Sequence, residues 1–522
     1  MKPFSITPCQ QYFWRSRPLA HLTGSDVFAR LFQPQTVKET LKATPAGIAT
    51  LLESPYPLPS ESLPDAARPM ARYSICAGAP RVTEGVPQLW TPPVGQILPL
   101  LAQLGSLRQS VSESPDSSAD GVVPDENLPF VGGWLGWLGY DLAWEIEQLP
   151  WLKEDALPFP VAFWYEPANF AVLDHQAQRL WLAAETMASL AGMDRQISAV
   201  SSMPRDSALA GSNATGSDRP MSTSSIYIDK PNIDRPLKFE TEQADFEQAV
   251  SQAKAHICAG DVFQVNHSLR FQTQTNSSSW EVYQKLHRIN PSPFASYWHT
   301  PWGSVVSCSP ERLVHLNAGV AQSRPIAGTR PRGKSQAEDS AIAQELLSDP
   351  KERAEHIMLV DLERNDLGRV CHWGSVQVNE LMSIERYSHV MHLVSNVVGQ
   401  FPVEGSAAQL IAALFPGGTI TGCPKVRCME IIETLEPVRR SLFYGSCGYF
   451  DKRGRLDLNI LIRTLLMAPT LSASSSEGLP SVGPSQTVWG QVGAGIVADS
   501  QPTKEWLESL QKAKAQLLAL GL

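Results

Sequence analysis

The sequence predicts an α+β fold, and three observations support this prediction. Segments with helical and strand-like periodicity follow one another in mixed order, without the regular strand–helix–strand repeat of a parallel α/β protein. No Walker sequence or Gly-x-Gly-x-x-Gly fingerprint occurs, because the glycines at 417–418 and 493–495 fit neither pattern. Residues 201–237 are dominated by Ser, Pro, Asp and Thr and have few large apolar residues. We therefore expect a flexible linker or loop there, between two structured regions.

The N-terminal region, residues 1–200, is predicted to contain mainly strands separated by Pro-rich turns. Residues 106–128, rich in Ser, Asp and Pro, are expected to form a flexible loop. Residues 130–142 form an apolar run interrupted by glycines, which favours a strand with close backbone approach. Further strands are predicted at residues 49–59 and 71–82, and a strand pair around a His-Gln turn at 173–184.

The C-terminal region, residues 238–522, mixes helices with strands. Residues 242–259 are predicted to form an amphipathic helix that Gly260 closes, and residues 503–520 a final helix that ends at Gly521. Between them the pattern predicts helices at 341–366 and 406–415, and strands at 261–271, 376–400, 442–450, 455–466 and 488–498.

Composition excludes several classes of protein. The 43 basic and 52 acidic residues among 522 give a net charge of −9 without a basic tract, which argues against nucleic-acid binding. There is no signal-peptide-like apolar segment and no uncharged run long enough to span a bilayer. The eight cysteines are scattered without a CxxC pair, so we expect a reducing, cytoplasmic location and no disulfides.

One stretch, residues 307–369, combines three kinds of polar group. Glu311 follows the turn-forming Ser-Pro pair and supplies an acid, and Gly328-Thr329 supplies backbone donors among several arginines. Glu355 supplies a carboxylate on a run with helical periodicity. Together these groups are suited to grip a small substrate with two negative charges and to help a hydroxyl group depart.

A metal site is a second interpretation of the same carboxylate. Glu505 and Glu508 are spaced i, i+3 on the final helix, and Lys512 follows Glu508 at i+4, so the three share a face. If that face meets Glu355, two helices offer hard oxygen ligands suited to Mg²⁺ with retained waters. The alternative is that each glutamate is an ordinary charge on a helix surface.

Four further residues have a structural and a functional interpretation. His392 lies in an apolar run, where a core histidine and a neutral proton acceptor are both consistent with the sequence. Arg463 lies among apolar residues and needs an anionic partner if it is buried, either a protein group or a ligand. Lys425 follows glycines whose N–H groups are able to reach an anion. Tyr449 alone indicates a core residue.

These motifs occur in an order that resembles the chorismate-utilising enzyme family, which includes anthranilate, aminodeoxychorismate, isochorismate and salicylate synthases. The resemblance is dense over residues 240–515 and weaker for LLES and RYSI nearer the N-terminus. The matching motifs are GDVFQVNHSLRF, NPSPF, SPER, RPIAGTRPRG, RAEHIMLVDLERNDLGRV, HVMHLVS, FPGGTITGCPKVRCMEIIE, GSCGYFD, IRT, GAGIV and EWLESLQKA.

The resemblance implies a large anthranilate synthase component I-like fold, with core β-sheets as a β-sandwich surrounded by helices, and chorismate bound together with Mg²⁺. It implies that Glu355 and Glu508 are metal ligands with Glu505 as a third contact. Glu311 then corresponds to the general acid that protonates the departing C4 hydroxyl, and His392 to the histidine of pyruvate elimination. The implied substrate contacts are Asn266, Gly328, Thr329, Tyr449, Arg463, Gly493 and Lys512, with Lys425 as a further candidate.

The resemblance also bears on the reaction. Members that add water have a lysine base where this sequence has Gln264, so Gln264 implies an aminating member. Ammonia carries a lone pair and needs no such base. In this group ammonia comes from a separate glutamine amidotransferase subunit, and no glutaminase cysteine motif occurs here. The chain is therefore expected to be the synthase component of a heterodimer.

The signals for the two aminating branches conflict. Asn266 and the C-terminal motifs resemble aminodeoxychorismate synthase, whose product leads to p-aminobenzoate and folate. Ala327 occupies the position of a lysine that, in many aminodeoxychorismate synthases, attacks C2 of chorismate covalently. Alanine has no nucleophile, which favours direct attack by ammonia as in anthranilate synthesis for tryptophan. We take aminodeoxychorismate synthase as the first interpretation and anthranilate synthase as the alternative.

The N-terminal motifs have two interpretations, and the function has a third alternative. LLES and RYSI resemble the tryptophan pocket of the group, with Glu53 and Ser54 as contacts, although ordinary strand packing explains them equally well. A non-catalytic chorismate-binding relative is the third functional alternative. It predicts loss of the acid or a metal ligand, whereas Glu311, Glu355 and Glu508 are all present.

Overall fold

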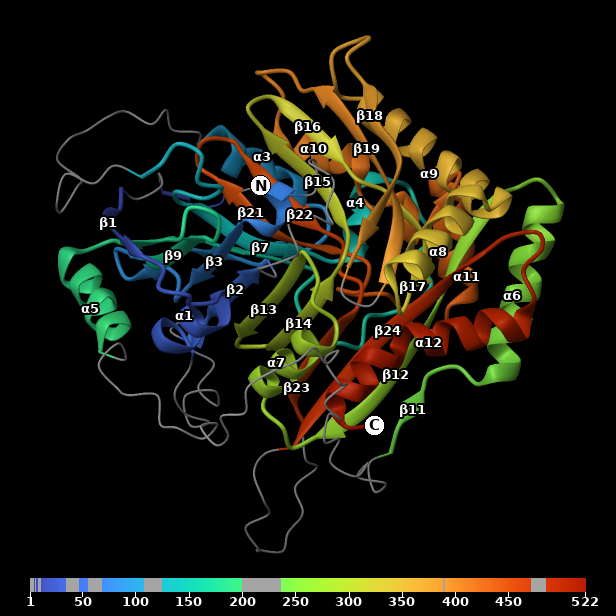
Figure 1. The fold of residues 1–522 in the computed structure, drawn as a ribbon, viewed down its shortest axis with the longest axis horizontal. Coiled ribbons are helices and arrows are strands. Elements are labelled where there is room, and N and C mark those ends of the chain that lie inside the picture. Colours follow the sequence, from blue (N-terminus) through green and yellow to red (C-terminus); the bar gives the residue numbers. More distant parts are fainter. Residues whose placement is uncertain are drawn as a thin grey trace, which may run out of the picture.

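The structure confirms an α+β architecture of two large antiparallel sheets flanked by helices (Figure 1). The computed structural model describes residues 4, 6–7, 11–33, 47–54, 68–107, 124–199, 236–387, 390–470 and 485–522. Most of the predicted loop at 106–128 and of the predicted linker at 201–237 lies outside these ranges.

The first sheet is built from both halves of the chain. β2 of the N-terminal region pairs with β13 of the C-terminal region, with Leu52 opposite Ser296. The regions 1–200 and 238–522 therefore share one sheet. Its order is β1 (Phe13–Pro18), β10 (Arg179–Ala184), β9 (Asn169–Asp174), β3 (Tyr73–Ala77), β2 (Ala49–Glu53), β13 (Phe294–Thr300), β14 (Gly303–Ser309), β23 (Thr464–Pro469), β24 (Gln486–Ile496), β12 (Gln264–Thr275) and β11 (Lys238–Phe239), with β20 (Gly422–Cys423) beside β12.

The second sheet is likewise shared, because β7 of the N-terminal region pairs with β21. A Cβ on Gly136 of β7 would overlap the carbonyl of Phe163, so the close backbone approach predicted for this glycine-rich run is confirmed. The order is β17 (Ile326–Pro331), β19 (Val390–Gln400), β16 (Val320–Ser323), β15 (Arg312–Asn317), β22 (Leu456–Asn459), β21 (Ser446–Asp451), β7 (Gly133–Leu138), β8 (Ala162–Tyr165) and β6 (Leu89–Trp90), with β18 (Gln377–Arg386) beside β19.

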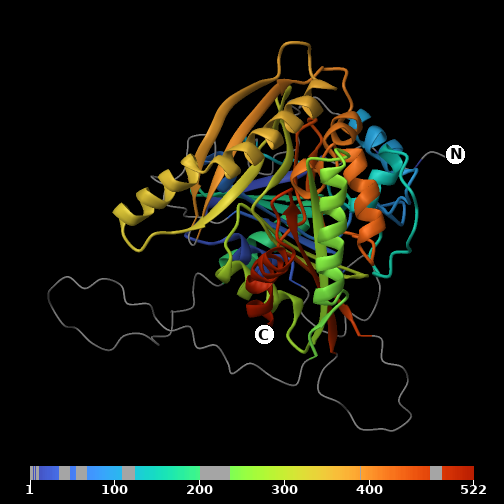
Figure 2. The same cartoon turned by 90° about the vertical axis from the view of Figure 1, so that its right-hand side faces the viewer.

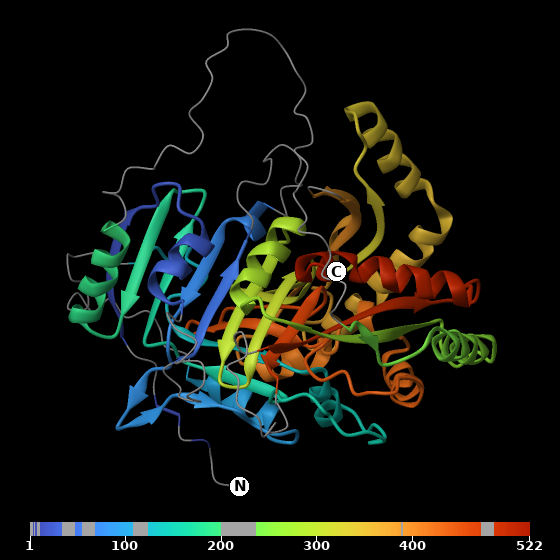
Figure 3. The same ribbon diagram turned by 90° about the horizontal axis from the view of Figure 1, so that it is seen from below.

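The main core lies where the two sheets face each other. It includes the fully buried indoles of Trp134, Trp137 and Trp164 from the second sheet and Trp298 from the first. A second core lies between the first sheet and the helices that cover its other face, which stand in a row in Figure 3. These helices include α1 (Gly24–Leu31), α5 (Met187–Ser198), α7 (Ser279–Ile289) and α12 (Pro502–Leu520).

Helix ends that carry local signals are confirmed. The helix predicted at 242–259 is α6 (Gln243–Cys258), and Gly260 follows it with φ +81°. The final predicted helix is α12, after which Gly521 adopts φ +79°. Both glycines take the left-handed conformation that closes a helix without a steric penalty. The strand pair predicted at 173–184 corresponds to the end of β9, a turn and β10.

Three predicted elements are each divided in the structure. The strand predicted at 455–466 contains β22 and the start of β23, which lie in different sheets. The helix predicted at 341–366 is two helices, α8 (Gln336–Ser348) and α9 (Pro350–Gly368). Asp349 separates them because its side chain accepts hydrogen bonds from two N–H groups of α9 and Pro350 cannot continue α8. The strand predicted at 376–400 is the antiparallel pair β18–β19. Figure 2 shows the gold helix α9 running alongside these orange strands.

Two predictions from composition agree with the structure. All seven cysteines among the described residues are free thiols. Within the same ranges, no helix has an apolar stretch of the length needed to cross a bilayer.

Candidate active site

Most of the predicted site residues form one connected group where β12 and β24 of the first sheet approach β17 and β19 of the second. Helices α9 and α12 close the group on the outside (Figure 1). The members are Gln264, Asn266, Glu311, Gly328, Thr329, Glu355, His392, Arg463, Gly493, Glu505, Glu508 and Lys512.

Gln264, at the start of β12, reaches across to helix α9. Its Nε2 donates a hydrogen bond of 2.9 Å to Oε1 of Glu355. Because a carboxylate oxygen only accepts, this bond fixes which end of the amide faces Glu355. The opposite oxygen, Oε1, is buried and has no hydrogen-bond partner among the residues that the structure describes. Room for this side chain depends on Gly495, since a Cβ there would overlap Nε2 of Gln264.

Asn266 lies two residues further along the same strand and therefore on the same face. Its Nδ2 donates to the carbonyl of Thr419 over 3.2 Å, in the short 3₁₀ turn η5 (Gly418–Ile420). This bond leaves Oδ1 of Asn266 buried without a partner. Two orphaned acceptors on one strand face indicate that a donor-bearing ligand completes the site, because buried polar groups are normally paired.

Gly493, on β24, lies directly beside the acceptor oxygen of Asn266. A Cβ at this position would lie 2.9 Å from Oδ1 of Asn266, 2.9 Å from the hydroxyl of Tyr444 and 2.8 Å from the carbonyl of His267. The carbonyl of Gly493 accepts a 2.9 Å hydrogen bond from Nζ of Lys512 on α12. The absence of a side chain at Gly493 therefore keeps the space between Asn266 and Tyr444 open.

Gly493→Ala is expected to lower kcat/KM for the physiological substrate by about 10-fold to 10²-fold, because overpacking of this kind costs about 1–3 kcal/mol. Gly192→Ala is the matched control, since a Cβ there meets nothing within 4 Å. Steady-state kinetics of both variants would check this expectation. Equal activity of the two variants would show that Gly493 does not border the substrate.

Carboxylates from two helices flank Lys512. Nζ of Lys512 pairs with Glu508 at 2.9 Å, and the charges of Lys351 and Lys512 act on both Glu355 and Glu505. Burial raises the pKa of Glu355 on α9, and burial likewise raises the pKa of Glu505 on α12. The two helices thus present their acids to one shared region, as the sequence pattern requires for a metal site.

These acids have the chemistry of a Mg²⁺ site. Carboxylate oxygens are the ligands that Mg²⁺ prefers, and half-buried acids with a raised pKa gain from a nearby cation. Among the described residues, however, no three His, Cys, Asp or Glu side chains lie close enough to surround an ion together. The donor set fits the ion with water completing its shell, and Glu355, Glu505 and Glu508 are the residues that would hold it.

Glu311 is the acid of the group. Its side chain lies at the start of β15 and is only 5% exposed. Burial raises the pKa of Glu311 to about 8, the nearby Glu363 adds to the increase, and contacts with the Thr419 hydroxyl and the N–H of Ile326 oppose it. The carboxyl group is therefore protonated at neutral pH and available as a proton donor.

On the opposite side of the group, β17 and β19 hold Thr329 and His392 together. Nδ1 of His392 lies 3.0 Å from the hydroxyl of Thr329 and 3.4 Å from the carbonyl of Gly328. Gly328 adopts φ +66°, a left-handed conformation that favours glycine. Burial lowers the pKa of His392 to about 4, and the charge of Arg463 contributes, so the ring is neutral at pH 7.

Arg463 is a cation with no counter-ion in the part of the chain that the structure describes. The side chain of Arg463 forms no hydrogen bond or ion pair with any of the described residues, although burial lowers its pKa and Tyr444 lies nearby. Its backbone has φ +52°, and that of Tyr444 has φ +66°. Left-handed non-glycine residues are uncommon and cluster at functional sites. The unpaired guanidinium is positioned to bind an anionic ligand.

Two predicted contacts lie elsewhere, and one residue was missed. Tyr449 lies on β21 opposite Asp457, on the wall of a different cavity, while Tyr444 is the tyrosine beside Gly493 and Arg463. Lys425 begins α11 (Lys425–Leu435), and its Nζ pairs with Asp366 at 2.6 Å instead of facing the site. The sequence contains both tyrosines in one run, and spacing alone does not distinguish them.

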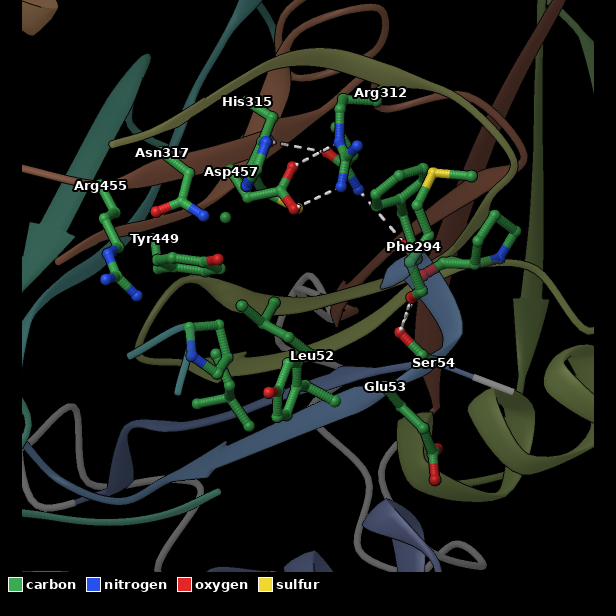
Figure 4. A pocket seen from close by; sticks show the side chains of 18 of the residues that line it. Leu52, Glu53, Ser54, Phe294, Arg312, His315, Asn317, Tyr449, Arg455 and Asp457 are labelled. Atoms are coloured by element: carbon green, nitrogen blue, oxygen red, sulfur yellow. Dashed lines mark hydrogen bonds and ion pairs between the residues drawn. The ribbon is translucent and has the colours of Figure 1, made fainter. Parts of the chain in front are cut away.

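A cavity of about 350 Å³ lies between the two sheets, apart from this group (Figure 4). Glu53 at the end of β2 and Ser54 directly after it line this cavity. The carboxylate of Glu53 is engaged by Ser25 and by the hydroxyl of Tyr283, and Ser54 donates to the carbonyl of Met70. Because their polar groups are already hydrogen-bonded within the protein, these two residues mainly contribute to the shape of the cavity wall. Other lining residues include Leu52, Tyr73, Phe294, Arg312, His315, Asn317, Tyr449, Arg455 and Asp457.

Comparison with known families decides the identity of the group. Residues 92–518 match the family model described as chorismate binding enzyme. The chain belongs to the chorismate-binding enzyme family. The family assignment made from the motifs is thereby confirmed, and the chain is a chorismate-utilising enzyme.

Similar proteins of this family carry two names. "Anthranilate synthase component I-like protein" of Synechocystis sp. is 54% identical over 98% of this chain and 92% of its own length. "Aminodeoxychorismate synthase component 1" of Bacillus subtilis is 42% identical over 75% of this chain and 78% of its own. "Anthranilate synthase component 1" of Synechocystis sp. is 41% identical over 75% and 77%.

A solved structure shares the predicted fold of this chorismate-binding enzyme. The crystal structure of anthranilate synthase component I from Streptococcus pneumoniae matches with a TM-score of 0.66 at 29% identity, covering 89% of this chain and 95% of that chain. The anthranilate synthase component I-like fold is therefore confirmed.

Proposed function

We propose that the protein is the synthase component of an aminodeoxychorismate synthase, which converts chorismate and ammonia to 4-amino-4-deoxychorismate in p-aminobenzoate and folate biosynthesis. The observation that carries the proposal is the pairing of a protonated acid with a site that lacks a base for water. Glu311 holds its proton at neutral pH, and Gln264 is a neutral amide bonded to Glu355.

The chemistry follows from these two residues. Glu311 donates its proton to the C4 hydroxyl, so the C–O bond breaks and water leaves. Ammonia needs no deprotonation before it forms the new C4–N bond that replaces the broken C4–O bond, and the orphaned oxygens of Gln264 and Asn266 are acceptors suited to its N–H groups. After attack the new ammonium group releases a proton, which balances the one that Glu311 gave.

Charge at the site supports binding of a dianionic substrate. The unpaired guanidinium of Arg463 and the ammonium group of Lys512 are suited to the two carboxylates of chorismate. We include Mg²⁺ in the proposal, with Glu355, Glu508 and Glu505 as the residues that would hold it. When bound, the ion supplies positive charge that orders a substrate carboxylate.

The choice of branch rests on Asn266 and on the relatives. Asn266, which resembles the residue of aminodeoxychorismate synthases, is fixed by Thr419 and directs its oxygen toward Gly493. Synechocystis sp. has a protein named anthranilate synthase component 1 as well as the 54% identical "component I-like" protein. The more similar of the two is therefore a second enzyme of this family in one organism, which supports a different product.

Anthranilate synthase component I is the second candidate, and two observations favour it. Ala327 on β17 is buried and has no nucleophile, so no covalent step through this position is available. His392 is neutral and bonded to Thr329, as a base for pyruvate elimination requires. If the product is 4-amino-4-deoxychorismate, ammonia must therefore attack without a covalent lysine intermediate.

Product analysis tests the proposal directly. The purified full-length chain, supplied with chorismate, Mg²⁺ and ammonium at about pH 8, where free ammonia and the protonated form of Glu311 are both present, is expected to release 4-amino-4-deoxychorismate. Chromatography with authentic standards separates this product from 2-aminobenzoate. Formation of 2-aminobenzoate without any 4-amino-4-deoxychorismate would overturn the proposal and establish the alternative. No turnover with ammonium, or with glutamine in the presence of an amidotransferase, would favour the third alternative, a non-catalytic chorismate-binding protein.

We further propose that a glutamine amidotransferase subunit supplies ammonia to this chain. The "component 1" names of the relatives indicate enzymes with a second component. Turnover with free ammonium but not with glutamine, by the chain alone, is the expected behaviour of a synthase that depends on such a partner.

The cavity between the sheets is proposed as a tryptophan pocket. It combines the aromatic side chains of Tyr73 and Phe294 with polar groups, among them Arg312, whose guanidinium lies over the Phe294 ring. Calorimetric titration is expected to detect tryptophan binding to the wild type and to lose it in Leu52→Trp, which fills the cavity that Leu52 borders (Figure 4). Absence of heat with the wild type would favour simple strand packing at LLES and RYSI.

A further inference from the structure

A second buried acid, Glu363 on α9, lies behind the proton donor. We propose that Glu363 is a positioning residue for the reaction: its carboxylate holds the transferable proton on Glu311. The inference rests on the proposed function, because it concerns the acid that releases the C4 hydroxyl. Glu363 is not one of the residues that we expect to contact the substrate.

The same two chain segments hold both acids. Oε1 of Glu363 lies 3.8 Å from the position of a Cβ on Gly418, and the next residue, Thr419, contacts Glu311. Ser323, at the end of β16, donates to Oε2 of Glu363 over 2.7 Å, and Ile326, at the start of β17, contacts Glu311 through its N–H. Each acid therefore has one neighbour on both segments, residues 418–419 and 323–326, which places the two buried carboxyl groups near each other.

Ser323 allows Glu363 to hold or release a proton without loss of hydrogen bonds. Its hydroxyl lies 2.7 Å from Oε2 of Glu363 and 3.2 Å from the carbonyl of Leu313, two residues after Glu311. When Glu363 is ionised, Ser323 donates to its carboxylate. When Glu363 is protonated, it donates to Ser323, which then donates to Leu313. Both charge states are therefore compatible with the packing.

Glu363 ionises before Glu311 as pH rises, because burial and the charge of Asp366 raise the pKa of Glu363 only to about 7, whereas the pKa of Glu311 is raised to about 8. Asp366 on α9 opposes ionisation of Glu363, but Asp366 is itself paired with Lys425 of α11, at 2.6 Å, and lies near Arg369. Lys425 and the Ser323 hydroxyl both favour the ionised form of Glu363. Glu311 has no ion pair among the described residues and faces the negative charge of Glu363.

The consequence is an acid that stays protonated where an isolated carboxyl would not. Two buried carboxyl groups that lie close together oppose each other's ionisation, so charge on one raises the pKa of the other. Removal of the charge on Glu363 should therefore release the proton of Glu311 at lower pH. A role limited to packing predicts no such change.

Glu363→Gln in the full-length chain tests the proposal, because the amide preserves shape and removes the charge. The carboxylic C=O stretch of Glu311 is followed by infrared difference spectroscopy as pH rises, and Glu311→Gln identifies the band. The expected result is a titration midpoint for Glu311 that falls by about one pH unit relative to wild type. The alkaline limit of kcat, measured at constant free ammonia, should fall by the same amount.

Matched variants keep the result interpretable. Asp361→Asn, on the exposed face of the same helix, should leave the midpoint unchanged, since the side chain of Asp361 is 62% exposed. If Glu363→Gln does not fold, Ser323→Ala replaces it, because loss of the hydroxyl donor reduces the charge on Glu363 and should lower the midpoint less strongly. A folded variant with reduced kcat at every pH and an unmoved midpoint overturns the proposal.

The infrared measurement requires no turnover, so it separates this inference from the proposed function. If wild type forms no aminated product, the proposed function fails, whatever the midpoint does. If wild type forms the product and the midpoint does not move in Glu363→Gln, only the role of Glu363 fails.

Discussion

Glu311→Gln is expected to lower kcat for the aminated product by about 10²-fold to 10⁴-fold, the range that loss of a general acid typically costs. The amide keeps the size of the side chain but carries no proton to give to the departing hydroxyl. KM for chorismate should change little, because the acid acts on the transition state more than on binding. Steady-state kinetics with chorismate and ammonium would measure both parameters.

The pH dependence of the wild type has a sign set by the same group. Burial raises the pKa of Glu311 to about 8, so the active acid form predominates at pH 7 and is lost as pH rises through that value. At constant free ammonia, kcat should fall about tenfold for each further pH unit. Glu404→Gln, at an exposed position, should keep the wild-type profile. If Glu311→Gln retained full activity, Glu311 would not be the general acid of the reaction.

Arg463→Met is expected to raise KM for chorismate by about 10²-fold, since hydrogen bonds to charged groups contribute roughly 1.5–3 kcal/mol. The guanidinium of Arg463 has no counter-ion among the described residues, so the substrate carboxylate is its partner in the proposal. Removal of an unpaired cation from a largely buried position should also raise the Tm of the free protein. The two opposite effects distinguish a binding residue from a structural one.

Arg439→Met is the matched control for this prediction. Arg439 is also buried, but it pairs with Asp141 at 3.0 Å and lies against the rings of Trp144 and Trp151, at 4.0 and 3.8 Å. Its loss leaves the Asp141 charge uncompensated and should lower the free energy of unfolding by about 3–5 kcal/mol. A Tm that falls in both variants would mean that Arg463 has a structural partner after all.

The sequence predicted elements whose ends carry local signals. Gly260 and Gly521 close helices because the left-handed conformation is a property of the residue itself. The division at Asp349-Pro350 also has a local cause, but helical periodicity on both sides concealed it. The sequence has no glycine between the end of β18 and the start of β19, so residues 376–400 were predicted as one strand.

For the site, motif order predicted which residues gather but not the orientation of each side chain. Glu355 and Glu505 come from helices far apart in sequence, and only the resemblance indicated that they face one region. Tyr444 and Tyr449 lie five residues apart in one apolar run, and the left-handed backbone at Tyr444 directs that residue to the site. Backbone conformation of this kind depends on tertiary packing, which no single-chain pattern records.

The pairing of β2 with β13 affects how the chain is made. When only the first half of the chain has been synthesised, the edge of β2 that later pairs with β13 (Phe294–Thr300) is unpaired. Unpaired strand edges promote aggregation. If the chain is divided within residues 201–237, each of the two fragments should therefore be insoluble when expressed alone. Enzyme activity should return only when both fragments are co-expressed. Nascent chains of this enzyme should accordingly depend on chaperones until β13 has emerged from the ribosome.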